Sequence, residues 1–288
     1  MFLKLNFNIP ALVTVIVIAA GLLVTSAKAD NVPADRVLSI GGSVTEIVYA
    51  LGEQDRLIGR DTTSSYPAEA KSLPDVGYMR ALSPEGILSV DPQIIIAEDG
   101  SGPAETIAVM RAADIPFFTV PDGYDRAAVS AKILAVADAL GVPAKGEALA
   151  AEIDAQFATL NTSTDSPLRV MFILSTQGGR ILASGDNTGA DGIIELAGGI
   201  NAITEFEGYK PLTDEAIIAA NPDVIVMMDR GGDHSMADTD LWANPAISTT
   251  NAAQTQSIVR INGLLLLGFG PRTPKAATQL HTALYGGE

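Results

Sequence analysis

Apolar residues along this chain follow two alternating patterns, short continuous runs and longer segments with helical spacing. Continuous apolar runs are typical of parallel strands covered on both faces, and spacings of three and four residues are typical of amphipathic helices. The apolar runs cover Arg36–Ile40, Gln93–Ala97, Ile115–Val120, Leu168–Leu174 and Val224–Met228. Helical spacing covers the segment after Gly42, then Pro103–Ala113, Asp125–Leu140 and Ala144–Leu160. The alternation predicts an α/β fold.

The alternation starts again after one long helix, which divides the chain into two parts. We expect two Rossmann-like α/β lobes, residues 30–143 and 162–288, joined by a single long helix over residues 144–161. A ligand cleft is expected between the lobes, because small ligands bind preferentially between domains. In the first lobe, Ser43-Val44-Thr45-Glu46 follows two glycines and predicts a capping box at the start of a helix.

An internal repeat supports the two-lobed organisation. Leu82–Ile96 aligns with Leu212–Val226 without a gap at an offset of 130 residues, and the two segments share Leu, Glu, Ile, Pro and Ile. Each begins with an expected N-cap, Ser83 or Thr213, and continues through a short helix and a proline into a buried strand. Two lobes of like topology are the simplest interpretation.

The composition excludes several classes of function. The chain has 288 residues, a formal charge of −16, 5% aromatic residues, two histidines and no cysteine. Such an acidic chain repels a phosphate backbone and offers few rings for base stacking, so we expect no nucleic-acid partner. The lack of cysteine excludes disulfides, thiolate catalysis and a lipid-modified N-terminal cysteine. Two histidines are too few for a three-histidine zinc site.

The first thirty residues have the pattern of an export signal. Lys4 precedes an apolar run from Ile9 to Val24, and Ala27-Lys28-Ala29 forms an A-x-A cleavage site. We therefore expect a signal peptide over residues 1–29, cleavage after Ala29 and a periplasmic protein. An uncleaved membrane anchor is the alternative, because the apolar run approaches spanning length.

Two glutamates occupy the same place in the repeat. Glu85 and Glu215 lie in the first turn of the short helix of each copy, where the helix dipole favours a carboxylate. They are ordinary first-turn acids by one interpretation. By the other they dock onto a two-fold symmetric partner, which requires such a pair.

Three segments carry a resemblance to a known family: Asp75–Ile87 (DVGYMRALSPEGI), Gly208–Thr213 (GYKPLT) and Asn262–Ala276 (NGLLLLGFGPRTPKA). The chain resembles the haemin-binding periplasmic proteins of bacterial haem ABC importers, within the helix-linked class that also carries cobalamin and ferric siderophores. The resemblance implies a substrate-binding protein that holds ferric haem between its lobes and delivers it to an inner-membrane ABC permease dimer for iron uptake. It further implies an outer-membrane haem receptor upstream. We expect a monomer with modest lobe motion and no catalysis.

In that family a tyrosine of the first lobe coordinates the haem iron, and Tyr78 holds the matching position. Ferric iron prefers a hard anionic oxygen, and tyrosinate is an axial ligand of haem in other proteins. Arg80 follows two residues later, so in an extended segment both side chains leave the same face. Arg80 can then support the phenolate or pair with a haem propionate. The alternative is a half-buried tyrosine beside a solvated arginine.

The second lobe supplies further candidates. The strand at Val224–Met228 delivers Met228 and Arg230 to its carboxyl end, where open α/β sheets place ligands. We expect Met228 to contact the apolar ring, Arg230 to contact a propionate, and Tyr209 to face Tyr78. The alternatives are that Met228 packs in the hydrophobic core and that Arg230 is a solvated residue of a surface loop.

One departure from the family concerns a second iron ligand. Some members carry a histidine in the loop after the first strand of the second lobe, whereas this loop reads Ser175-Thr176-Gln177-Gly178-Gly179. The sequence leaves the distal ligand and the number of haems open. Two other hypotheses also stay open, namely the same fold carrying cobalamin or a ferric siderophore, and a two-lobed periplasmic enzyme.

Overall fold

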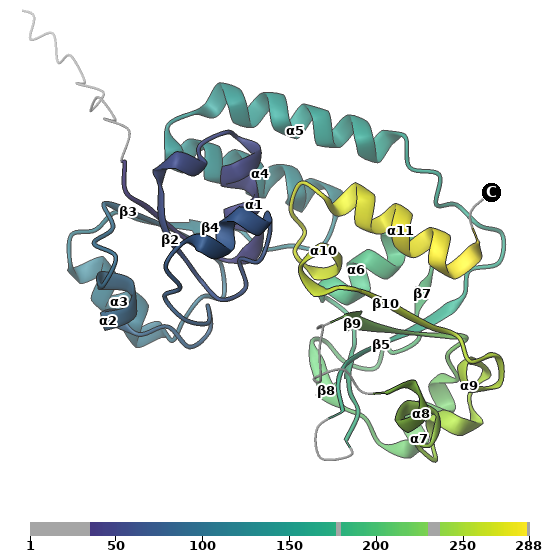
Figure 1. Ribbon diagram of the computed structural model, residues 1–288. Coiled ribbons are helices and arrows are strands. Elements are labelled where there is room, and N and C mark those ends of the chain that lie inside the picture. Colours follow the sequence, from purple (N-terminus) through teal and green to yellow (C-terminus); the bar gives the residue numbers. More distant parts are fainter. Residues whose placement is uncertain (1–34, 177–179, 230–236, 287–288) are drawn as a thin grey trace, which may run out of the picture. The chain divides into compact units, whose positions relative to one another are not determined.

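A computed structural model describes residues 35–176, 180–229 and 237–286. The expected signal peptide and Arg230 lie outside these residues. Within them, no helix combines the length and the hydropathy needed to cross a membrane. The predicted two-lobed α/β fold is confirmed, with one sheet in each lobe (Figure 1).

The first sheet is entirely parallel, with the order β2-β1-β3-β4. Its strands are four or five residues long, and the central ones are almost fully buried, as expected for strands covered on both faces. The bounds are β1 (Val37–Ile40), β2 (Leu57–Arg60), β3 (Ile94–Glu98) and β4 (Phe117–Val120).

The second sheet repeats this arrangement and adds to it. Its parallel strands have the order β7-β5-β9-β10, which matches the first sheet strand for strand. An antiparallel pair, β6 and β8, is added beside the end of β5. The bounds are β5 (Arg169–Ser175), β6 (Leu182–Ser184), β7 (Ile200–Asn201), β8 (Tyr209–Pro211), β9 (Val224–Asp229) and β10 (Ile258–Asn262). The two lobes therefore share a parallel core, whereas the second sheet is mixed.

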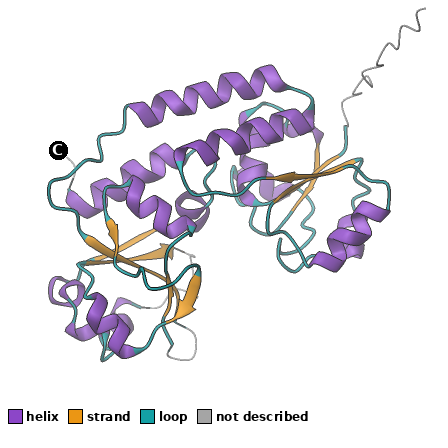
Figure 2. Cartoon of the chain, turned by 180° about the vertical axis from the view of Figure 1, so that it is seen from behind, coloured by secondary structure: helices purple, strands orange, loops and turns teal. Residues whose placement is uncertain are grey.

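Helices cover both faces of each sheet (Figures 1 and 2). In the first lobe, α1 and α4 contribute to the core on one face and α2 and α3 to that on the other. In the second lobe, α6, α10 and α11 cover one face and α7, α8 and α9 the other. The bounds are α1 (Gly42–Ala50), α2 (Pro84–Leu88), α3 (Ala104–Ala112), α4 (Arg126–Leu140), α6 (Gly189–Leu196), α7 (Asp214–Ala220), α8 (Asp238–Trp242), α9 (Asn251–Thr255), α10 (Gly263–Leu267) and α11 (Thr273–Tyr285).

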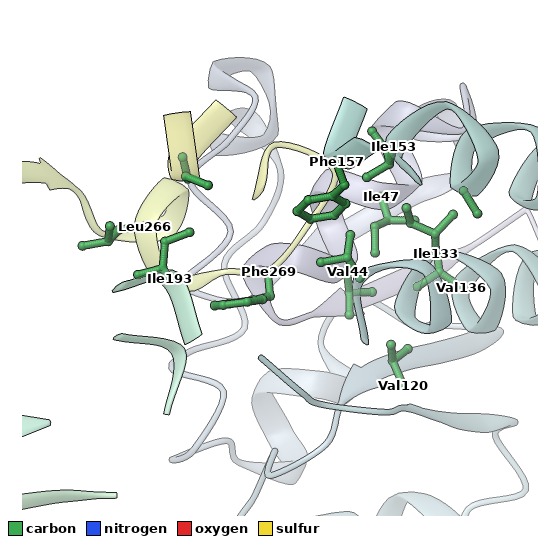
Figure 3. Close-up of a cluster of buried hydrophobic side chains, with 14 of the residues drawn as sticks. Val44, Ile47, Val120, Ile133, Val136, Ile153, Phe157, Ile193, Leu266 and Phe269 are labelled. Atoms are coloured by element: carbon green, nitrogen blue, oxygen red, sulfur yellow. The ribbon is translucent and has the colours of Figure 1, made fainter. Parts of the chain in front are cut away.

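The predicted long helix is observed as α5 (Pro143–Ala158), between the last helix of the first lobe and the first strand of the second. It packs closely on α4, and a Cβ at Gly146 would lie 2.4 Å from the Cβ of Ala137. One hydrophobic core contains side chains of both lobes together with Ile153 and Phe157 of α5 (Figure 3). The domain boundaries placed at this helix remain a prediction.

The structure of the repeat agrees with its sequence. Ser83 and Thr213 are N-caps whose side chains accept hydrogen bonds from Gly86 and Ala216 N–H. Asp91 and Asn221, again 130 residues apart, both have left-handed backbone conformations with φ of 48° and 37°. The two copies therefore share the type of helix cap and the left-handed residue that precedes the proline.

The capping box predicted at Ser43 is wrong. Helix α1 begins at Gly42 with Gly41 as its N-cap and without a side-chain cap. Glu46, the expected capping acid, instead forms a 2.6 Å ion pair with Arg272, which precedes α11. A partner 226 residues away in the sequence has thus displaced the local interaction.

Candidate functional site

The Tyr78 loop is held against the end of β2 in the first lobe. Asp75 anchors it, because its carboxylate accepts hydrogen bonds from Arg60 at 2.8 Å and from Gly77 N–H at 2.9 Å. Gly77 has a φ of 105°, which a residue with a side chain adopts only with strain. Met79 is buried in the core and holds the loop down. The side chain of Tyr78 remains 44% exposed.

Arg80 contacts Tyr78, but not through the extended segment that the sequence predicts. Residues 78–81 form a turn closed by a hydrogen bond from Ala81 N–H to the Tyr78 carbonyl at 2.8 Å, and the segment is not extended. Within this turn, Nη1 of Arg80 donates a long 3.4 Å hydrogen bond to the Tyr78 phenol oxygen. The Arg80 guanidinium therefore lies beside an exposed phenol. The role of Arg80 toward a ligand remains a prediction.

Tyr209 lies on β8 of the second lobe and is half-buried. Its ring makes an edge contact with Phe172, with 6.4 Å between the ring centroids. Burial raises the pKa of Tyr209 and outweighs the opposite effects of its polar neighbours and of the Arg80 charge. That Tyr209 faces Tyr78 remains a prediction.

Met228 lies near the end of β9 and is half-buried. Its side chain packs against the start of α10, where a Cβ at Gly263 would lie 2.8 Å from the sulfur. Glycine at position 263 therefore leaves room for the methionine. Contact between Met228 and a ligand remains a prediction.

Sequence reasoning missed a second tyrosine and arginine pair that joins the two lobes. The Arg272 guanidinium carbon lies 3.4 Å from the ring centroid of Tyr66, which is 42% exposed. The same guanidinium forms the ion pair with Glu46 described above. Arg272 belongs to the GFGPRTP segment that carries the family resemblance, and this segment was the available signal.

A buried ion cluster at the carboxyl end of the first sheet was also missed. The Lys132 side chain is 1% exposed and its ammonium group lies 2.6 Å from Glu98 and 2.8 Å from Asp122. The hydroxyl of Tyr124 donates to the same Asp122 at 2.8 Å. Burial opposes the charge of Lys132, but the two carboxylates outweigh it and raise the lysine pKa. The spacing of residues in the sequence gives no signal for this cluster, because the partners of Lys132 lie 34 and 10 residues away along the chain.

The two repeat-related glutamates are both exposed, in the first turns of α2 and α7. The pKa of Glu215 lies below its usual value, because its own backbone N–H and the Thr213 hydroxyl bond to the carboxylate. Both side chains are therefore free to meet a partner from solvent.

A pocket of about 630 Å³ lies elsewhere, between the end of α5 and α11. Leu160, Lys275 and His281 line it together with several threonines, and none of the predicted site residues does. Among the described residues no group of three or more His, Asp or Glu is placed to hold a metal ion. The candidate site therefore depends on the exposed phenol of Tyr78 and its arginine.

Comparison with known proteins identifies the family. The model of the periplasmic binding protein family matches residues 37–263, so the chain belongs to this family. It is similar to the periplasmic haem-binding protein BhuT in complex with two haems, with 40% identity, a TM-score of 0.80 and coverage of 86% of this chain and 97% of BhuT. The apo haem-binding protein RhuT from Roseiflexus sp. RS-1 shows 39% identity and a TM-score of 0.83, and covers 87% of this chain and 97% of RhuT.

A relative with a different printed ligand is also similar. The vitamin B12-binding protein of Vibrio cholerae is 27% identical over 264 residues, which are 90% of this chain and 92% of that protein. BhuT and RhuT are 40% and 39% identical to this chain, whereas the vitamin B12-binding protein is 27% identical to it.

Proposed function

We propose that this chain is a periplasmic substrate-binding protein that binds ferric haem and delivers it to an inner-membrane ABC permease. The observation that carries the proposal is the exposed Tyr78 phenol with the Arg80 guanidinium 3.4 Å away. An accessible phenol beside a cation suits the axial coordination of ferric iron as tyrosinate. The 40% identity to BhuT supports haem as the cargo.

Tyr78 is the iron ligand in this proposal, and Tyr209 is not. Burial raises the pKa of Tyr209, so its phenol stays neutral and is a poor anionic ligand. Arg80 supports the Tyr78 phenolate or pairs with a propionate. Arg230 makes a second propionate contact, and Met228 contacts the porphyrin because its polarizable side chain adapts to a large apolar ring.

Delivery uses the exposed glutamates. Glu85 and Glu215 each meet a basic residue on one of two permease subunits, which form a dimer. Export with cleavage after Ala29, supply of haem by an outer-membrane receptor, a monomeric state and the absence of catalysis complete the proposal.

Cobalamin is the second candidate cargo, because the Vibrio cholerae relative is named for vitamin B12 binding. In that case Tyr78 is a wall residue and forms no bond to iron.

A haemin titration of the mature protein, followed by absorption spectroscopy, tests the proposal. Wild type is expected to bind saturably and to give a ferric tyrosinate spectrum that Tyr78→Phe abolishes. Tyr66→Phe is the matched control, because it removes the hydroxyl of another exposed tyrosine, and it is expected to keep the spectrum. Saturable binding with an unchanged spectrum in Tyr78→Phe would discard Tyr78 as the ligand. Saturable binding of cobalamin without binding of haemin would identify cobalamin as the cargo instead of haem.

A further inference from the structure

A buried carboxylate without a counterion lies at the carboxyl end of the first sheet. Asp61 directly follows β2, and the residue is 0% exposed. In the part of the chain that the structure describes, no lysine or arginine forms an ion pair with it. Burial of a carboxylate is unfavourable unless a cation or hydrogen bonds compensate for the lost water. Hydrogen bonds must therefore hold this side chain in place.

Four hydrogen bonds compensate for the burial of Asp61. Its Oδ1 accepts from Gly41 N–H at 3.0 Å and from the Ser64 hydroxyl at 2.7 Å. Its Oδ2 accepts from the N–H and from the hydroxyl of Thr63, at 2.9 Å and 2.7 Å. A carboxylate has about four acceptor positions, so all of them are used. An amide in its place would turn its own N–H groups toward some of these donors.

These bonds fix two segments at once. Gly41 is the N-cap of α1, a helix without a side-chain cap of its own, and Asp61 supplies an acceptor there from 20 residues away. A carboxylate is favoured at this end of a helix by the helix dipole. The bonds to Thr63 and Ser64 hold the loop after β2, residues 61–66, in a tight turn. This loop is therefore tied to the start of α1 through one buried group.

The loop after β2 is in turn bonded to the Tyr78 loop. Thr62, which follows Asp61, donates from its N–H to the Gly77 carbonyl at 2.9 Å. Its hydroxyl donates to Oδ1 of Asp75 at 3.1 Å. Gly77 immediately precedes Tyr78 in the chain. A single backbone hydrogen bond thus connects the segment that Asp61 fixes to the segment that carries the candidate iron ligand.

We propose that Asp61 is a positioning residue for Tyr78 and holds its phenol where it can coordinate the iron of the cargo. The inference rests on the proposed function, because it takes Tyr78 as the iron ligand, and it adds the buried group that fixes this ligand. An exposed side chain on a loop coordinates a metal well only where supporting contacts keep it in the productive geometry. Without them, apparent affinity falls in proportion to the fraction of molecules whose loop is correctly placed.

Hydrogen exchange of the cargo-free protein tests the hold on the Tyr78 loop. Asp61→Asn is expected to speed amide exchange in residues 75–80 severalfold, because part of the support of the loop is lost. Thr63→Val is expected to have a smaller effect in the same direction. It removes one of the four hydrogen bonds and decides the question where Asp61→Asn does not fold. Unchanged exchange in both variants would overturn the inference.

Thr250→Val is the matched control for these variants. Thr250 is a threonine of the second lobe, 1% exposed, whose hydroxyl caps α9 by accepting a hydrogen bond from Ala253 N–H. Its loss is expected to lower the melting temperature, because a helix cap is removed, without changing exchange in residues 75–80. Faster exchange of that segment in Thr250→Val as well would show a general loss of stability and would overturn the inference.

A double-mutant cycle with haemin tests whether the effect passes through Tyr78. Asp61→Asn is expected to weaken haemin binding roughly tenfold, as for a loop correctly placed in about one molecule in ten. It is also expected to weaken the tyrosinate band of the saturated complex. In the Tyr78→Phe background the same substitution is expected to change the affinity little, since the ligand that it positions is already absent. Equal losses in the two backgrounds would overturn the inference.

The two measurements separate the failure of this inference from the failure of the proposed function. A wild-type protein with a tyrosinate spectrum and equal losses in the cycle would keep haem as the cargo and discard the positioning role of Asp61. A wild-type protein that binds no haemin would discard the cargo and, with it, the positioning of an iron ligand. Faster exchange in Asp61→Asn would then show only that Asp61 holds the loop.

Discussion

Nη1 of Arg80 lies 3.4 Å from the phenol oxygen of Tyr78, in a turn that a buried methionine holds in place. The charge of the same arginine also acts on Tyr209 of the second lobe. One exposed cation thus contacts an exposed phenol, and its charge acts to lower the pKa of a half-buried one. This relationship makes Arg80 the most informative residue to change.

Replacing Arg80 with glutamine is expected to weaken haemin binding about tenfold, because a charge-assisted hydrogen bond to the ligand is lost. Arg80→Lys keeps the charge but loses the forked geometry, so an intermediate affinity is expected. Haemin titrations of the three proteins at one pH and ionic strength provide the comparison. Equal affinity in all three would mean that Arg80 contacts neither the phenolate nor the cargo.

The variant Tyr209→Phe is expected to keep the ferric tyrosinate spectrum. Burial raises the pKa of the Tyr209 phenol, so this residue supplies no anionic oxygen at neutral pH. Absorption spectra of the haemin complexes of Tyr209→Phe and Tyr78→Phe distinguish the two residues. Loss of the spectrum in Tyr209→Phe and its retention in Tyr78→Phe would exchange their roles.

Substitution of Lys132 by methionine is expected to lower the free energy of unfolding by about 3 to 5 kcal/mol, because it leaves two carboxylates of the ion cluster without their cation. The lysine is 1% exposed between Glu98 and Asp122. Lys145→Met is the matched control, since Lys145 is half-exposed beside Glu53 and its loss is expected to cost less than about 1 kcal/mol. Urea unfolding at pH 7 measures both, and equal effects would contradict the structural role of the cluster.

The stabilising effect of Asp122 is expected to depend on pH. Burial acts to raise the pKa of Asp122, but Lys132 and the Tyr124 hydroxyl outweigh it, and the pKa lies below its usual value. A carboxylate with a lowered pKa in the folded state stabilises the protein above its unfolded pKa of about 4, and this contribution is lost as the pH falls through the folded value.

The difference in unfolding free energy between wild type and Asp122→Asn is therefore expected to have its largest value at pH 7 and to shrink below about pH 4. Urea unfolding of both proteins at pH 7, 5 and 3 measures it. Asp55→Asn supplies a baseline from an exposed acid. A difference that stays constant across this range would show that the Asp122 charge has no part in the effect.

The sequence by itself determined the features that depend on nearby residues. Apolar runs indicated β1, β3, β5 and β9, because covered strands need side chains that are apolar on both faces. The run at β4 also indicated a strand, although β4 lies at the edge of its sheet and its two middle residues are exposed. The repeat indicated the matching caps at Ser83 and Thr213, which are interactions within four residues. Helix α4 begins after its Asp125 cap and ends at Gly141, which has a left-handed conformation. Tyr78 and Arg80 lie two positions apart, so their proximity is also a local feature, although a turn and not the predicted extended segment brings it about.

Tertiary structure decided what the charged and aromatic side chains do. Glu46 looks like a local capping acid, but a partner 226 residues away competes for it and forms the stronger, charge-assisted contact. Lys132 looks like a solvated helix residue, but the fold brings two carboxylates to it and makes its burial possible. Tyr78 and Tyr209 each follow a glycine with a positive φ, 105° at Gly77 and 80° at Gly208, and look equivalent in the sequence. The added antiparallel strands nevertheless half-bury Tyr209, and a turn exposes Tyr78. Burial depends on all the segments that surround a residue, so it could not be read from the neighbours in the chain.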